Sequence, residues 1–138
     1  MKKEFVSKNE SLELKKLGFD KECIAKYQKQ SEGAIYSFQW LKCPQNSNVL
    51  DNAISTPTFS QTFRWFREKY DLWSEIHVED NVRLGEQKYY WNIFGKYISY
   101  EGNNWIRAIV DSKGVMSNTY EEAELACLLE LINICKKK

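Results

Sequence analysis

The sequence predicts an α+β fold, a curved, mainly antiparallel sheet with helices packed on it, in the order α-β-β-α-β-β-β-α. Three helix starts can be recognised, two by a capping box and one by a Thr-Pro pair. Between them lie runs in which aromatic residues alternate with other residues, a pattern typical of strands. Short turn sequences join several of these runs, and tight turns favour antiparallel pairing.

A short first helix is expected over about 8–17, where Ser7 and Glu10 have the spacing of a capping box. In such a box the two ends of the motif satisfy free backbone N–H groups at the start of the helix. Gly18 then supplies a left-handed stop, because glycine adopts that conformation without steric cost. Local signals therefore bound this helix at both ends.

Two strands are expected next, over 22–28 and 34–41, with a turn at 31–33 between them. In the second strand three aromatic residues occupy alternate positions, so their rings point to one face of the sheet. That face is expected to be the core face, and its rings are Tyr36, Phe38 and Trp40. A polar loop is expected over 44–55.

The second helix is expected to start at Thr56 and Pro57, since threonine caps helices and proline at the first position gives up no hydrogen bond. Four aromatic side chains fall within an arc of roughly 60° and predict a buried stripe. They are Phe59, Phe63, Phe66 and Tyr70. Trp65 lies outside the stripe, on the flank of Lys69. It is either an exposed anchor for a partner or a ring that packs under a neighbouring loop.

Three further strands and a last helix complete the order. The strands are expected over 72–78, 89–100 and 105–110, with a hairpin loop at 101–104 and a turn at 111–114. A second capping box, from Thr119 to Glu122, starts the last helix. Apolar side chains cover roughly two thirds of the circumference of that helix, whereas a helix at the protein surface needs an apolar stripe only about 100° wide. The helix is therefore either the central buried element or a surface that buries a second face in an oligomer.

Length and composition narrow the class of protein. The chain has 138 residues without a visible linker or repeat, so a single α+β domain over 1–138 is expected. Its 20 basic and 19 acidic side chains give a net charge of +1, which argues against a polybasic nucleic-acid coat. No apolar run suits a secretory signal or a membrane span, so a cytoplasmic location is expected. The four cysteines lack the paired spacing of a zinc site, so reduced thiols and no metal are expected.

Candidate catalytic residues are sparse. His77 is the only histidine, and strand alternation places it on one face with Glu75. It is either a solvent-facing or paired histidine, or a general base with Cys43 or Cys23 as the nucleophile. Glycine-rich phosphate loops are absent, and helix caps and turns explain the acidic pairs. We therefore expect no enzyme activity and no cofactor.

Aromatic residues make up 14% of the chain, and several lie with basic residues in a hairpin over 88–107. Candidate partner-binding residues are Arg64, Trp65 and Lys69 of the second helix and Tyr90, Trp91, Trp105 and Arg107 of the hairpin. Trp, Tyr and Arg are enriched at the hot spots of protein interfaces, so binding to a protein partner is the expected function. The last helix is a candidate surface for a homodimer. The alternative is a module that binds single-stranded nucleic acid through the hairpin, by stacking bases on its rings.

Three blocks of the sequence resemble short uncharacterised proteins encoded by phages, prophages and mobile elements of Bacteroides-type gut bacteria. The blocks are SLELKKLGF near the N-terminus, FRWFREKYDL in the second helix and TYEEAELACL at the start of the last helix. They occur in the same order and span most of the chain, although Leu129 and Glu130 stand where a more basic pair is expected. The resemblance implies an intracellular accessory protein and carries over no functional residue.

Overall fold

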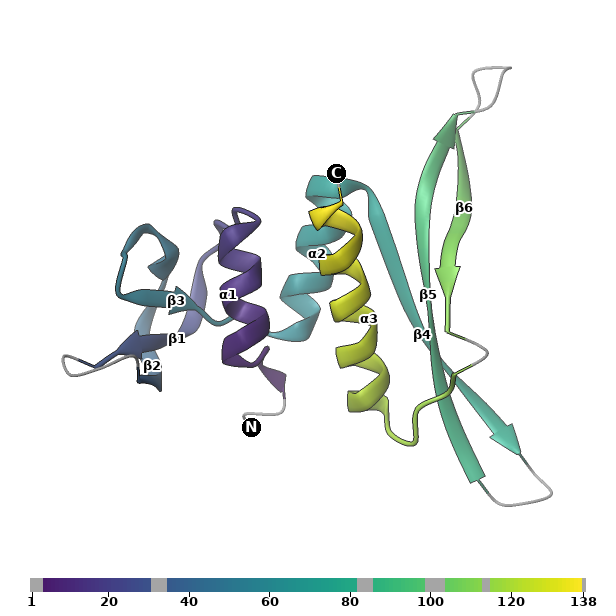
Figure 1. The fold of residues 1–138 in the computed structure, drawn as a ribbon, viewed down its shortest axis with the longest axis horizontal. Coiled ribbons are helices and arrows are strands. Elements are labelled where there is room, and N and C mark those ends of the chain that lie inside the picture. Colours follow the sequence, from purple (N-terminus) through teal and green to yellow (C-terminus); the bar gives the residue numbers. More distant parts are fainter. Residues whose placement is uncertain (1–3, 31–34, 82–85, 99–103, 113–114, 138) are drawn as a thin grey trace. The chain divides into compact units, whose positions relative to one another are not determined.

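The computed structural model describes residues 4–30, 35–81, 86–98, 104–112 and 115–137. Contacts divide the chain into two compact units, Met1–Thr62 and Phe63–Lys138, each with its own three-stranded antiparallel sheet (Figure 1). The predicted α+β class and the order of the helices and longer strands are confirmed, but the strands form two open sheets instead of one. The single domain over 1–138 stays a prediction.

The first unit contains one helix and the first sheet. Its elements are α1 (Lys8–Lys16), β1 (Cys23–Lys29), β2 (Tyr36–Gln45), the 3-10 turn η2 (Ser47–Val49) and β3 (Ala53–Ser55). The strand order is β2-β1-β3, and β1 is antiparallel to both neighbours. The division between the units falls inside α2 (Phe59–Tyr70). The expected turn at 31–33 lies outside the described residues, as do 101–103 and 113–114 of the two later turns.

The first helix lies close to where its end signals predict it. Ser7 is the N-cap residue of α1, but its side chain makes no capping hydrogen bond, so the predicted box with Glu10 is not formed. At the other end Gly18 has a φ of 92°, the left-handed conformation that a non-glycine residue adopts only at a steric cost. The bounds of this helix are therefore predicted to within a residue at both ends, although the capping hydrogen bond expected at its start is not formed.

The segment predicted as a polar loop over 44–55 contains a further strand, β3, which pairs with β1. Asn48 connects this segment to the rest of the unit. Its side-chain oxygen accepts a hydrogen bond from the N–H of Ser55 at 2.8 Å, and its amide nitrogen donates to the carbonyl of Phe19 at 2.9 Å. Phe19 and the pairing strand β1 are distant along the chain from this segment, which is why alternation of residues did not predict β3.

The predicted aromatic face of β2 is only partly buried. Phe5 packs edge-on against Phe38 and Trp40, with ring centroids 5.6 Å and 5.2 Å apart. Tyr36 and Phe38 are half-buried, whereas Trp40 is 52% exposed. Because β2 is an edge strand, it has a neighbouring strand on one side only. The expectation that all three rings belong to the core is therefore wrong for Trp40.

The second helix starts two residues later than expected, at Phe59. Thr58 caps it, since its hydroxyl oxygen accepts a hydrogen bond from the N–H of Gln61 at 3.2 Å. The spacing from Thr58 to Gln61 is itself that of a capping box, a signal that the Thr-Pro pair obscured. Thr56 instead donates its hydroxyl to the carbonyl of Ile54 at 3.4 Å. In the aromatic stripe Phe59 and Phe66 are buried, and Phe63 and Tyr70 are half-buried.

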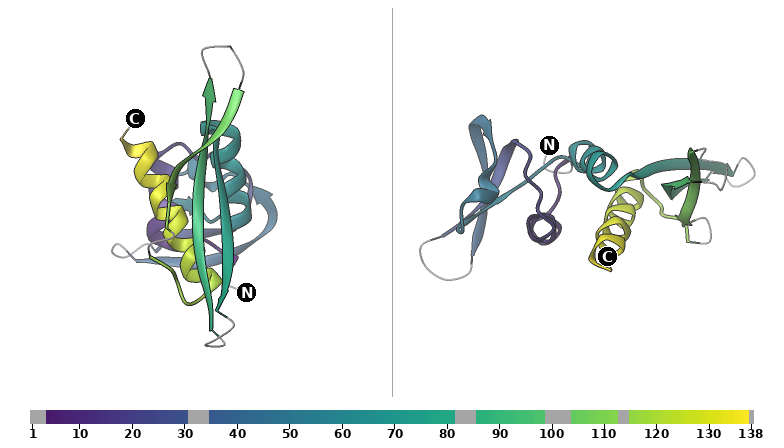
Figure 2. Two further views of the ribbon diagram at one scale, coloured as in Figure 1. Left: turned by 90° about the vertical axis from the view of Figure 1, so that its right-hand side faces the viewer. Right: turned by 90° about the horizontal axis from the view of Figure 1, so that it is seen from above.

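The second unit combines the second sheet with the last helix. Its strands are β4 (Leu72–Asn81), β5 (Glu86–Ile98) and β6 (Asn104–Asp111), with β5 in the centre, and its helix is α3 (Tyr120–Lys136). Figure 2 shows α3 lying across one face of this sheet. The hydroxyl oxygen of Thr119 accepts from the N–H of Glu122 at 3.1 Å, which confirms the predicted helix start.

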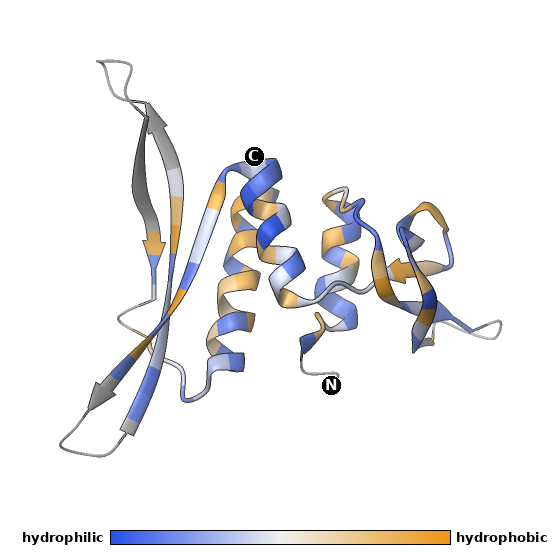
Figure 3. Cartoon of the chain, turned by 180° about the vertical axis from the view of Figure 1, so that it is seen from behind, coloured by the Kyte–Doolittle hydropathy of each residue, from blue (hydrophilic) through white to orange (hydrophobic). Residues whose placement is uncertain are grey.

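Apolar residues occupy much of α3, as the colouring in Figure 3 shows. Its buried residues span about half of the circumference at 3.6 residues per turn. They are Ala123, Cys127, Leu128, Leu131, Ile132 and Cys135. Leu125 and Leu129 are 37% and 47% exposed, so part of the apolar surface predicted for this helix faces solvent. None of the described helices is long and apolar enough to cross a membrane.

Candidate functional site

The pairing of β4 with β5 determines which side chains share a face of the second sheet. Ser74 of β4 interacts with the Cys127 thiol of α3, and Tyr89 of β5 contacts Tyr120 at the start of α3, so their face is the inner one. Directly opposite residues of an antiparallel pair share a face, and neighbours along a strand alternate. The outer face is therefore formed by Trp73, Glu75, His77 and Glu79 of β4 and Lys88, Tyr90, Asn92 and Phe94 of β5.

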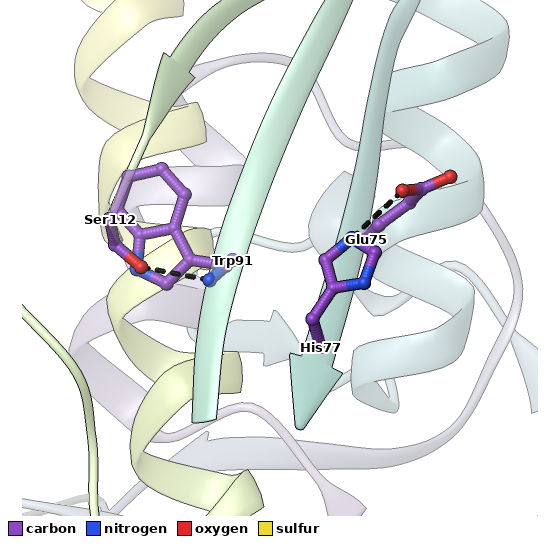
Figure 4. A network of polar contacts seen from close by, with 4 residues as sticks. All are labelled: Glu75, His77, Trp91 and Ser112. Atoms are coloured by element: carbon purple, nitrogen blue, oxygen red, sulfur yellow. Dashed lines mark hydrogen bonds and ion pairs between the residues drawn. The ribbon is translucent and has the colours of Figure 1, made fainter. Parts of the chain in front are cut away.

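His77 makes two contacts on the outer face. Its ring stacks on that of Tyr90 directly across the strands, with centroids 4.9 Å apart and planes 17° from parallel. Its Nε2 lies 3.0 Å from a carboxylate oxygen of Glu75 on the same strand (Figure 4). Of the two interpretations open from the sequence, these contacts match the paired surface histidine.

Trp73 lies at the start of the same row of side chains and is 38% exposed. The guanidinium of Arg67 lies 5.1 Å from the centre of its indole ring, which is a cation–π contact. Opposite it on β5 stands Phe94. Sequence reasoning missed Trp73, although alternation from His77 and Glu75 would have placed it on their face.

The hairpin residues predicted to bind a partner separate onto different faces. Tyr90 lies on the outer face, whereas Trp91 lies on the inner face. The backbone N–H of Trp91 donates to the hydroxyl of Ser112 at 2.8 Å (Figure 4). Trp105 and Arg107 belong to β6, but their side chains lie outside the described part of the chain. Tyr90 is therefore the hairpin candidate that the described part of the chain places on the outer face.

Trp65 does not provide the exposed anchor predicted for the second helix. Its indole is 2% exposed and packs edge-on against Phe66 and Tyr70, with centroids 5.1 Å and 5.5 Å away. The ammonium of Lys69 lies 5.0 Å from the centre of the same ring. Arg64 points to Glu68 one turn along the helix, at 3.0 Å. Of the two interpretations open for Trp65 from the sequence, the structure matches the packed ring, and the aromatic stripe is wider than its predicted arc.

Two buried thiols are poorly suited to nucleophilic chemistry. Burial raises the pKa of Cys23 and of Cys127 to about 12, so both thiols are protonated at neutral pH. Cys43 is exposed. Among the described residues no group of three His, Cys, Asp or Glu side chains is placed to hold a metal ion.

Comparison with known proteins adds nothing to this geometry. No family model, no curated protein and no solved structure matches the chain. The outer face of the second sheet is therefore assigned as the candidate site from its residues and contacts.

Proposed function

We propose that this chain is a non-enzymatic binding protein that recognises a protein partner through the outer face of its second sheet. Helix α3 lies on the inner side of this sheet (Figures 1 and 2). The observation that carries the proposal is the row of cross-strand pairs, in which Trp73 faces Phe94 and His77 stacks on Tyr90.

The row of pairs suits an interface because its rings are already ordered. A stacked pair has lost most of its side-chain freedom before any partner arrives, so little further entropy is lost on binding. Aromatic side chains of this kind supply most of the binding energy at protein interfaces. Trp73, which is 38% exposed beneath Arg67, is the expected hot spot.

The charges on the outer face favour a protein over a nucleic acid. On the exposed surface of β4, the carboxylate of Glu75 lies between the rings of Trp73 and His77, and that of Glu79 lies beyond His77. Lys88, the cation opposite Glu79, donates a hydrogen bond to Asn118. A phosphate backbone would meet these carboxylates at short range, and phosphate attraction dominates nucleic-acid affinity. A partner with apolar and basic side chains fits the surface better.

The cellular role that we propose rests on the resemblance of three sequence blocks to phage and mobile-element proteins. The chain is then an accessory protein of such an element, and it acts in the cytoplasm of the bacterial host. Single-stranded nucleic acid, bound through the hairpin 88–107, is the alternative partner that the test below separates from a protein.

The test is affinity capture from a Bacteroides-type host, with the tagged chain as bait and with or without nuclease. Trp73→Ala is expected to weaken capture of the partner about tenfold or more, since a tryptophan hot spot contributes about 2 kcal/mol. Trp40→Ala is the matched control, because it removes the same ring from the exposed edge of the first sheet.

Capture that survives nuclease and is lost with Trp73→Ala but kept with Trp40→Ala would support the proposal. Equal capture by wild type and Trp73→Ala would contradict the assignment of the outer face. Loss of every partner on nuclease treatment would contradict the protein partner and favour the nucleic-acid alternative.

A further inference from the structure

The β4 strand is an unpaired edge of the second sheet. The strand order is β4-β5-β6, so β4 pairs with β5 on one side, and no described residue pairs with its other side. The pairing with β5 is unbroken from Leu72 to Asn81, without a bulge. Proline is also absent from the strand. Bulges and prolines are two of the devices by which proteins block edge strands, and β4 lacks both.

Two copies of β4 that lie side by side and run in opposite directions place complementary side chains opposite each other. In one such arrangement, a two-fold axis perpendicular to the sheet passes between the two strands beside Ile76. Ile76 then faces Ile76 of a second copy, and Glu75 faces His77 of the second copy on the same side of the sheet. Because of the symmetry, this acid–base pair occurs twice.

Other positions of the axis are less favourable. An axis beside Glu75 places two Glu75 carboxylates opposite each other, and an axis beside His77 places Glu75 opposite Glu79 twice. Like charges directly across strands destabilise a sheet. An axis beside Val78 again pairs histidine with glutamate, but it matches only 75–81, whereas the axis beside Ile76 matches 72–80.

We propose that two copies of this chain pair antiparallel through their β4 edges, with the two-fold axis beside Ile76. The two second sheets then form one continuous sheet, and the unpaired backbone groups of β4 find partners. This dimer joins the edges of the two strands, and its test is separate from that of the proposed partner on the outer face, because its readout is self-association of the pure chain.

The first test is sedimentation of purified chains at low salt over a wide concentration range. His77→Glu sets two carboxylates opposite each other, and Glu75→Lys removes the carboxylates and sets ammonium groups opposite the imidazoles, so each variant alone is expected to dimerise about tenfold or more weakly than wild type. Mixed together, the two variants regain complementary pairs and are expected to form a heterodimer. Far-UV circular dichroism of each variant checks that its fold is kept.

The second test determines the register by disulfide formation in a Cys43→Ser background, which removes the exposed thiol. Opposite Cα atoms in an antiparallel pair lie about 4.5–5.5 Å apart, within the range that a disulfide spans. Ile76→Cys is therefore expected to cross-link to its own copy under mild oxidation. Val78→Cys, which faces Ser74 of the second copy, is expected not to do so.

A chain that stays monomeric at every concentration would overturn the proposal. So would a dimer whose affinity is the same in wild type, in Glu75→Lys and in His77→Glu. More efficient cross-linking of Val78→Cys than of Ile76→Cys would overturn the register.

Discussion

His77 and Tyr90 stand directly opposite each other on β4 and β5, and their rings stack with centroids 4.9 Å apart. The contact places the only histidine of the chain against an aromatic ring and beside the carboxylate of Glu75. It also identifies which neighbouring side chains share the outer face, because residues alternate along both strands.

The stack is expected to stabilise the second sheet. A double-mutant cycle of His77→Ala and Tyr90→Ala should give a coupling of about 0.5–1 kcal/mol in the free energy of unfolding, typical of a cross-strand pair with aromatic character. Urea denaturation measures the free energy of unfolding of the wild type, the two single variants and the double variant. Tyr89→Ala is the control, since Tyr89 is adjacent in sequence but lies on the inner face, and its coupling to His77→Ala should be close to zero.

Glu124 is expected to make the stability of the fold depend on pH. Partial burial, and then the charge of Glu121, raise the pKa of Glu124 from 4.5 to about 6. A carboxyl whose pKa is higher in the folded than in the unfolded chain destabilises the fold when it is ionised. The cost is therefore full above about pH 6, falls as the pH is lowered through 6, and disappears below about 4.5.

Glu124→Gln should accordingly raise the free energy of unfolding at pH 7.5 by less than about 1 kcal/mol, because the group is only partly buried. The gain over wild type should vanish at pH 4.5, as measured by urea denaturation across the pH range. In Glu121→Gln the pH midpoint should move down, because one source of the raised pKa is removed. A gain that is constant with pH would contradict this account.

Two adjacent leucines of α3 should respond differently to the same substitution. Leu128 is fully buried, whereas Leu129 is 47% exposed. Leu128→Ala should lower the free energy of unfolding by about 2–5 kcal/mol, because it leaves a cavity in the core. Leu129→Ala should change it by about 0.5 kcal/mol or less. Equal losses for the two variants would mean that Leu129 is covered in solution, as the predicted homodimer through the last helix would require.

The start of α2 should depend on Thr58. Thr58→Ala removes the hydroxyl that accepts the N–H of Gln61 and should cost about 1 kcal/mol in the free energy of unfolding. Thr58→Ser keeps the acceptor and should restore most of this loss. Ser60→Ala, a matched hydroxyl deletion at an exposed position in the first turn of the helix, should have little effect in thermal or urea denaturation.

The sequence by itself determined the α+β class, the order of the helices and longer strands, and most of their bounds. These features follow from interactions between residues close together in the chain. Examples are the hydrogen bond from the N–H of Glu122 to the Thr119 hydroxyl and the left-handed conformation of Gly18. Alternation likewise placed His77 and Glu75 on one face of a strand. Such signals are local because backbone hydrogen bonds at helix ends and the period of a strand involve residues a few positions apart.

Only the tertiary structure decided what each face contacts. It divided the strands between two sheets and brought β3 beside β1. The outer-face site and the free edge of β4 likewise depend on the register of β4 against β5. It also buried Trp65, whose position the helical pattern had left open, and it left Trp40 half exposed, although the strand pattern had placed that ring in the core. Burial depends on which distant side chains pack over a ring, and a periodic pattern gives a residue's direction but does not specify the partner that it meets there.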